Sequence, residues 1–315
     1  MTKKERVERV LAGQAVDRPP ICFWRHYGKI SPQETIDSHL KFLKETDMDI
    51  LKMMCDEHFT YPVNGTSVED IKALRPGGKD FFWVREQVER ATQINEALKG
   101  EVITFYNAFS PYSKMKHTIG DAESMWLIRN HEDVARHFME VICEDTCLMV
   151  EGILKESGTT GMMLPVQGAE NGRFTAEEYA TLIAPYERRV IETAEKYSKH
   201  NMLHMCGWDG LSNNLDWWDY PSHLLSWAVY AENMSPAEAR LRYPDRILVG
   251  GYDNRQGTLL HTGSKEDIQE HAREIVRTTG KDGLIIGADC SLPEDIDPQH
   301  IRWVAEALDE MAAAE

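Results

Sequence analysis

Short apolar runs alternate with longer amphipathic stretches along most of the chain. Eight of these runs have the length and the β-branched or aromatic content of buried strands. They are residues 20–24, 48–54, 102–108, 161–166, 201–206, 224–230, 246–251 and 283–288. Polar-faced helical stretches lie between them. Eight rounds of strand and helix predict a parallel α/β fold, a single (β/α)₈ barrel preceded by an N-terminal amphipathic helix.

Helix start signals agree with this pattern. Ser31 with Glu34, and Thr175 with Glu178, match the capping box, in which two side chains satisfy free amide groups at a helix N-terminus. The second box predicts a long helix over residues 176–200.

The alternative architecture is an open, doubly wound sheet. It is disfavoured because no G-x-G-x-x-G follows the first run, whose loop reads Arg25-His26-Tyr27-Gly28. No long linker or low-complexity segment divides the chain. We therefore expect one domain over residues 1–315.

Composition narrows the classes of partner. The chain has 52 acidic and 35 basic residues and a formal charge of −17. A nucleic-acid partner is not expected, because phosphate binding needs a concentrated basic face. No run approaches the roughly 20 apolar residues that span a bilayer, so no membrane segment is expected. The six cysteines are scattered and the N-terminus lacks an apolar signal core, which predicts a cytoplasmic protein with reduced thiols.

Three residues with metal-binding side chains lie at predicted strand ends. His204 and Cys206 are two residues apart, so on a strand they share a face, with Cα atoms about 7 Å apart. Cys290 ends the eighth strand at the same rim of the barrel. Two thiolates and one imidazole favour zinc, and three protein ligands with one open position are typical of catalytic zinc. A His-x-Cys pair also arises by chance, and buried cysteines often serve as small apolar residues.

Other polar residues follow the remaining strands at this rim, where barrel enzymes carry their chemistry. The candidates are Arg25 and His26 after the first strand, Asp56 and Glu57 after the second, Glu170 and Asn171 after the fourth, and Asp253 after the seventh.

These candidates receive different roles. Asp56, Glu57 and Glu170 are the predicted catalytic residues, and Glu170 or Glu57 could also occupy the fourth zinc position. The predicted substrate-binding residues are Arg25, His26, Asn171 and Asp253. The planar fork of Arg25 suits a sulfonate or carboxylate, although a structural ion pair with Asp56 or Glu57 is equally consistent.

Several segments resemble the uroporphyrinogen decarboxylase superfamily, and most closely its zinc-dependent methylcobalamin:coenzyme M methyltransferases and related corrinoid methyltransferases. The resemblance covers essentially the whole chain. It is carried by Lys4-Glu5-Arg6-Val7, Asp17-Arg18-Pro19-Pro20, His204-x-Cys206-Gly207, Gly250-Gly251-Tyr252-Asp253 and Gly287-Ala288-Asp289-Cys290.

The chain departs from true decarboxylases at the substrate-binding segments. Their Met-Arg-Gln-Ala-Gly-Arg-Tyr stretch is replaced here by Phe23-Trp24-Arg25-His26-Tyr27-Gly28-Lys29, which keeps one arginine. Asp56 is the nearest counterpart of their essential aspartate. Where they have Gly-His-Gly-Ile, this chain has Ala288-Asp289-Cys290-Ser291.

The resemblance implies a zinc-dependent transfer of a methyl group between methylcobalamin, held on a partner corrinoid protein, and a thiol or other acceptor activated on zinc. The direction of transfer stays open. Two alternatives remain: a metal-free uroporphyrinogen decarboxylase, and a non-catalytic barrel that binds a corrinoid or another partner.

Overall fold

A computed structural model describes residues 1–28, 31–56 and 59–314 of the chain. Its centre is a parallel sheet of seven strands, ordered in space as in sequence. The strands are β1 (Ile50–Met53), β2 (Ile103–Asn107), β3 (Gly161–Val166), β4 (Met202–Met205), β5 (Leu224–Trp227), β6 (Ile247–Tyr252) and β7 (Leu284–Ala288). Every strand is buried along its whole length, as expected for a parallel sheet covered on both faces.

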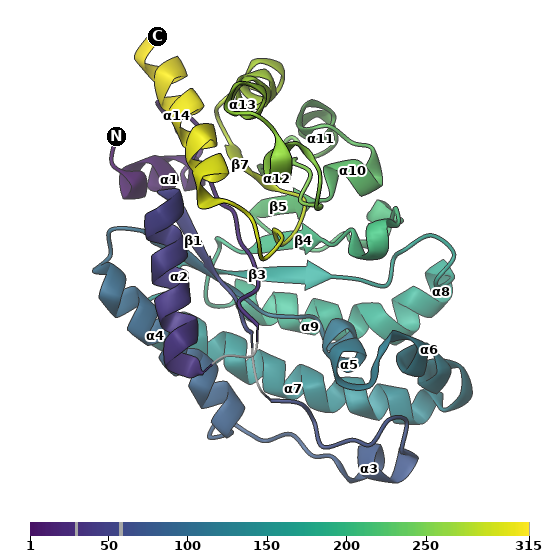
Figure 1. Cartoon of the computed structure of the whole chain (residues 1–315). Helices are drawn as coiled ribbons and strands as arrows, with labels where there is room; N and C mark the ends of the chain where they lie inside the picture. Colours follow the sequence, from purple (N-terminus) through teal and green to yellow (C-terminus); the bar gives the residue numbers. More distant parts are fainter. Residues whose placement is uncertain (29–30, 57–58, 315) are drawn as a thin grey trace.

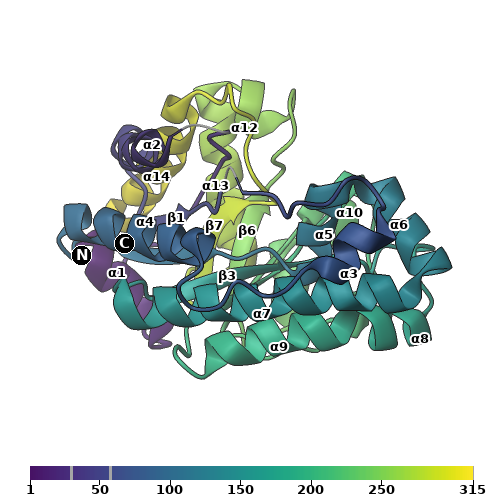
Figure 2. The same cartoon turned by 90° about the horizontal axis from the view of Figure 1, so that it is seen from below.

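The sheet curls, and helices cover its outer face (Figures 1 and 2). Side chains alternate between the two faces with period two. In β1, Leu51 and Met53 belong to the large apolar core under the helices, whereas Ile50 belongs to a smaller core with Trp24 and Phe105. We call the side that carries this smaller core the inner face of the sheet.

The helices are α1 (Lys3–Leu11), α2 (Pro32–Thr46), α3 (Val68–Ala73), α4 (Phe82–Leu98), α5 (Pro111–Ile119), α6 (Asp121–Asn130), α7 (Glu132–Glu156), α8 (Ala176–Glu178), α9 (Ala184–Glu195), α10 (Val229–Glu232), α11 (Pro236–Arg242), α12 (Leu259–Thr262), α13 (Lys265–Thr279) and α14 (Pro298–Ala314). Both predicted capping boxes are present, at Ser31 and Thr175. Within the described ranges, no helix is long and apolar enough to cross a membrane.

The helical stretch predicted over residues 176–200 is present, but it contains a π-helical turn and ends five residues early. The chain forms α8, then a π-helical turn over Tyr179–Ile183, then α9, which ends at Glu195. Pro185 has no amide hydrogen to continue the α-helical ladder. The carbonyl of Thr181 instead accepts a hydrogen bond from Nη1 of Arg136 at 2.7 Å.

The sixth predicted strand also ends early. β5 stops at Trp227, and α10 begins at Val229, inside the predicted run 224–230. The carboxylate of Asp289 accepts a hydrogen bond from the amide of Tyr230 at 3.0 Å. An acceptor at this position satisfies a free amide of a helical first turn, so the backbone turns there.

Residues 20–24, the first predicted strand, run between the two edges of the sheet. The amide of Cys22 donates to the carbonyl of Ile286 in β7 at 2.9 Å. On the other side, the carbonyl of Ile21 accepts from the amide of Ile50 in β1 at 3.3 Å. On the β7 side, Ile21 and Ile286 form an isolated bridge rather than a continuous ladder. The two hydrogen bonds connect β7 to β1.

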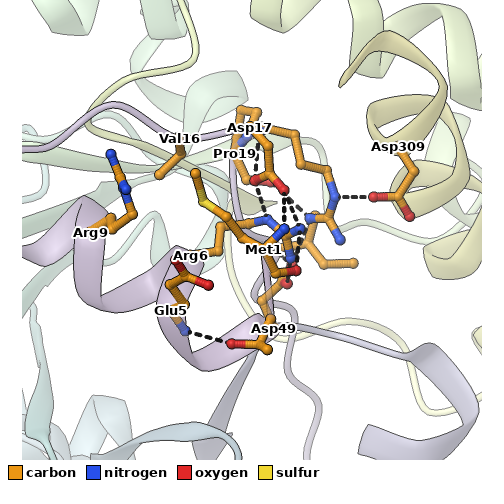
Figure 3. A network of polar contacts seen from close by, with 12 residues as sticks. Met1, Glu5, Arg6, Arg9, Val16, Asp17, Pro19, Asp49 and Asp309 are labelled. Atoms are coloured by element: carbon orange, nitrogen blue, oxygen red, sulfur yellow. Dashed lines mark hydrogen bonds and ion pairs between the residues drawn. The ribbon is translucent and has the colours of Figure 1, made fainter. Parts of the chain in front are cut away.

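A buried carboxylate fixes the start of this segment. Asp49, whose side chain has no exposed surface, accepts hydrogen bonds from Arg6 at 2.6 Å, Arg18 at 2.8 Å and the amide of Ile21 at 2.9 Å. Arg6 also pairs with Asp17, and Arg18 with Asp309 of α14. Figure 3 shows Arg6, Asp17, Asp49 and Asp309 around this network. It joins α1, the start of β1 and α14.

Replacing Asp49 with alanine is expected to destabilise the fold strongly, because two buried arginines lose their shared partner. Removal of one member of a buried ion pair costs about 3–5 kcal/mol. The matched control is Asp216→Ala, whose carboxylate is 91% exposed and pairs with Arg242 at the surface. That change should cost at most about 1 kcal/mol. Urea denaturation followed by circular dichroism compares the two, and equal midpoints would contradict the assignment.

Candidate metal centre

His204, Cys206 and Cys290 meet at the carboxyl ends of β4 and β7. His204 lies in β4, Cys206 follows that strand directly, and Cys290 lies two residues beyond β7. One ligand atom from each side chain lies within 4.8 Å of the other two. His204 and Cys206 are buried and Cys290 is half-buried. The parallel sheet thus brings together residues separated by more than 80 positions in the sequence.

The imidazole of His204 has one nitrogen engaged and one free. The register of the sheet pairs His204 with Ser226 of β5, and Nδ1 lies 3.1 Å from the Ser226 hydroxyl. Nε2 is buried without a hydrogen-bond partner among the described residues. The indole of Trp24 packs edge-on against the ring, with centroids 5.9 Å apart. Nε2 is therefore the nitrogen available as a ligand.

The two thiols influence each other's ionisation. The interaction with Cys206, together with nearby His204, lowers the pKa of the Cys290 thiol well below its usual value. The same interaction with Cys290, reinforced by burial, raises the pKa of Cys206. The side-chain amide of Gln167 donates a hydrogen bond to Cys206 Sγ at 3.4 Å. The two sulfurs thus interact closely, and thiolate sulfurs are the ligands that a soft cation prefers.

The donor set fits zinc. Tetrahedral bonds of about 2.3 Å to sulfur and 2.0 Å to nitrogen place donor atoms roughly 3.5–4 Å apart, inside the observed spacing. A ligating histidine usually hydrogen-bonds through its other nitrogen, as His204 does with Ser226. Across the described ranges no fourth histidine, cysteine or carboxylate joins this group. An ion here would keep an open position.

Charged groups lie around the cluster without completing it. Glu170 is fully buried, and neither of its carboxylate oxygens has a hydrogen-bond partner in the described part of the chain; Arg173 Nε lies 3.6 Å away. Lys116 places its ammonium 3.5 Å from the ring centre of Trp208. Burial lowers the pKa of Lys116, and the charges of Glu170 and Cys206 oppose this shift. Glu170 remains a predicted catalytic residue.

The predicted catalytic Asp56 pairs with the predicted substrate-binding His26. Asp56 accepts from the amide of Tyr27 at 2.6 Å, and its other oxygen lies 2.6 Å from His26 Nδ1. Burial raises the pKa of Asp56, but these hydrogen bonds and the charge of His26 outweigh it, so the net shift is downward. The imidazole is thereby held in one orientation at an open cavity of about 250 Å³. Glu57 lies outside the described residues.

The other predicted substrate-binding residues are engaged in loops. Arg25 donates to the carbonyl of Glu294 at 2.6 Å and stacks on Phe42, so the ion pair with Asp56 does not form. Asn171 bonds to Ser212 at 2.8 Å. Asp253 pairs with Arg255. None of the three belongs to the cluster, and their substrate contacts stay predictions.

Three residues near the cluster were missed in the sequence: Lys52, Gln167 and Ser226. Ser226 could be found only from the register of β4 and β5. Gln167 directly follows β3, the position at which rim residues were sought. Lys52 carries the clearest signal, because a lysine inside the fully buried strand Ile50–Met53 requires a reason.

A second buried carboxyl lies behind Gln167. Glu187 of α9 accepts from Tyr179 at 2.5 Å, Tyr220 at 3.2 Å and the amide of Gln167 at 3.3 Å. Burial raises the pKa of Glu187 to about 7. Tyr179 begins the π-helical turn. This network fixes the backbone of Gln167, whose side chain contacts Cys206.

A parallel sheet with reactive side chains at its carboxyl ends defines an α/β protein of enzyme type. The family model described as uroporphyrinogen decarboxylase (URO-D) matches residues 52–311, more than half of the chain. The chain therefore belongs to the uroporphyrinogen decarboxylase family. No curated protein matches its sequence.

Solved structures share the fold. A methyltransferase from Methanosarcina mazei aligns with a TM-score of 0.73 at 14% identity, covering 98% of this chain and 99% of that one. A B12-independent methionine synthase from Shewanella sp. W3-18-1, in complex with selenomethionine, aligns at 0.55 and 14%, covering 94% of both chains. A putative vitamin-B12 independent methionine synthase from Listeria monocytogenes aligns at 0.51 and 12%, covering 93% and 96%. At identities of 12–14%, the similarity to these structures shows a shared fold and nothing more.

The raised pKa of Glu187 predicts a pH-dependent stability. Its value of about 7 lies above the ordinary 4.5, so the protonated carboxyl is favoured in the folded state. The protonated carboxyl contributes about 3 kcal/mol to the free energy of unfolding. This stabilisation is fully present below pH 4.5 and is lost as the pH rises through 7. Glu187→Gln should remove that part of the pH dependence. The urea denaturation midpoints of the wild type and of Glu187→Gln, measured at pH 5 and pH 8, test this prediction. If the midpoint changed equally between the two pH values in both proteins, the effect would be excluded.

Proposed function

We propose that the chain is a zinc-dependent methyltransferase that moves a methyl group between a corrinoid and a thiol, working with a partner corrinoid protein. The observation that carries the proposal is the convergence of His204, Cys206 and Cys290, with Nε2 of His204 buried and unpaired. A tetrapyrrole decarboxylase has no use for such a donor set. The methyltransferase and methionine synthases that share the fold support the same class of chemistry.

The proposal includes the architecture. We count residues 20–24 as the first strand of a (β/α)₈ barrel, because they bond to both β7 and β1. The whole chain, residues 1–315, then forms one domain, and α1 is its N-terminal extension. The three candidate metal ligands then lie at the carboxyl ends of the barrel strands, the side on which barrel enzymes bind their substrates.

Zn²⁺ held by these side chains would supply Lewis acidity that lowers the pKa of a thiol substrate. His204 and the two cysteines hold the ion, and Ser226 orients the imidazole. In the direction toward the thiol, a sulfur lone pair forms the S–CH₃ bond while the Co–CH₃ bond breaks. The electron pair of the broken Co–CH₃ bond stays on cobalt, and the thiol proton leaves to solvent.

The remaining candidates are assigned supporting roles. Asp56 fixes His26, which could exchange a proton at the cavity beside the mouth. Glu170 and Lys116 set the charge next to Cys206. Uroporphyrinogen decarboxylation is the second candidate function, favoured by the family membership and by the position of Asp56 at an open cavity.

The metal centre predicts one Zn²⁺ per chain. The double variant Cys206→Ser, Cys290→Ser should lower metal affinity at least 100-fold, because thiolates supply two of three donors. Cys147→Ser is the matched control: this half-buried thiol lies on α7, outside the cluster, and its loss should leave the zinc content unchanged. Elemental analysis and competition with a chromogenic chelator measure both. A wild-type protein free of zinc after loading would refute the centre.

Loaded protein is expected to demethylate methylcobalamin with at least one member of a thiol panel, seen as the loss of its absorption spectrum. Chelation should abolish the reaction, and Cys147→Ser should retain it. Conversion of a porphyrinogen by metal-free protein would favour the decarboxylase instead. Tight zinc binding with no demethylation by any thiol would favour a corrinoid-binding protein without catalysis.

A further inference from the structure

A lysine side chain lies on the inner face of the sheet, where Trp24 separates it from His204. Lys52 of β1 is 3% exposed. It alternates with Leu51 and Met53, which belong to the outer core, so its side chain lies on the inner face with Ile50. The apolar residues of this inner core include Trp24, which also contacts His204. A lysine in such surroundings loses its hydration.

The ammonium of Lys52 contacts a thioether sulfur and an aromatic ring rather than a carboxylate. Nζ lies 2.8 Å from Sδ of Met54 and 4.9 Å from the ring centre of Trp24. No carboxylate of the described residues forms an ion pair with it within 4.0 Å. The buried Arg6 and Arg18 differ, since both share the carboxylate of Asp49. The positive charge of Lys52 therefore lacks a dedicated structural counter-ion.

The available negative charge comes from thiols. Burial lowers the pKa of Lys52 to about 8, and charges on Cys55, Cys290 and Cys22 oppose that shift. Burial also raises the pKa of Cys22 and Cys55, which keeps both neutral. Cys290, one of the three candidate metal ligands, is the other thiol within reach of the lysine charge. Asp56 contributes less and is already bonded to His26. Trp24 contacts both the ammonium of Lys52 and the ring of His204, so the charge of Lys52 lies next to the candidate metal centre.

We propose that Lys52 is a positioning residue whose fixed positive charge makes the metal centre prefer an anionic ligand, so that the substrate enters as a thiolate. The inference rests on the proposed function. A divalent cation with two thiolates and a neutral imidazole has no net charge. Lys52 adds one positive charge beneath it, and an anion at the open position restores neutrality. A neutral methyl donor would leave the buried charge uncompensated.

The test uses Co²⁺ in place of Zn²⁺, because sulfur-to-cobalt absorption bands report ligand binding without turnover. The probes are 2-mercaptoethanol, which binds as an anion, and imidazole, which binds neutral. Lys52→Met keeps the length of the side chain and removes its charge. We expect the apparent affinity for 2-mercaptoethanol to fall at least tenfold and that for imidazole to change less than threefold. Lys52→Gln should behave like Lys52→Met, and Lys52→Arg should recover thiol binding.

The outcomes separate the two proposals. Equal changes for both probes, or no change for either, would overturn the charge role of Lys52 while leaving the metal centre intact. Loss of thiol preference in Lys52→Arg as well as in Lys52→Met would assign the residue to packing instead. Wild-type protein that binds no Co²⁺ at all would overturn both proposals together. Should Lys52→Met not fold, the comparison of Lys52→Gln with Lys52→Arg decides in the same way.

Discussion

The positions of Trp24, Arg25 and His26 depend on how residues 20–24 join the two edges of the sheet. Hydrogen bonds from this segment to β7 and β1 bring Trp24 beside His204 and place Arg25 and His26 next to the ends of the neighbouring strands. The buried carboxylate of Asp49 holds the start of the segment through its amide bond to Ile21. A charge network at one end of the strands thus determines geometry at the other.

Most strand positions, and the meeting of His204, Cys206 and Cys290, could be predicted because they follow from local rules. Period-two alternation places His204 and Cys206 together, and parallel strands bring Cys290 to the same edge. The π-helical turn could not be predicted, because it depends on Arg136 capping a carbonyl 45 positions away. The contacts of Arg25 with Glu294 and Phe42 are similarly distant in sequence. The charge environment of Lys52 requires knowing which thiols share the inner face.

Family membership and side-chain chemistry answer different questions here. The uroporphyrinogen decarboxylase family accounts for the scaffold, which the solved structures share at low identity. The reaction depends on what stands at the strand ends. In the proposed function, the sulfur and nitrogen donors would hold a soft metal with an open position, and the buried ammonium of Lys52 would favour an anionic ligand there. These two properties belong to this chain rather than to the fold.

The pairing of His204 with Ser226 has a further consequence. Because the register of β4 and β5 sets the hydroxyl beside Nδ1, strand pairing itself fixes the orientation of the imidazole ring, and Nε2 stays without a hydrogen-bond partner among the described residues. The ring does not need to rotate when a cation arrives. Part of the entropic cost of assembling the coordination sphere has already been met during folding.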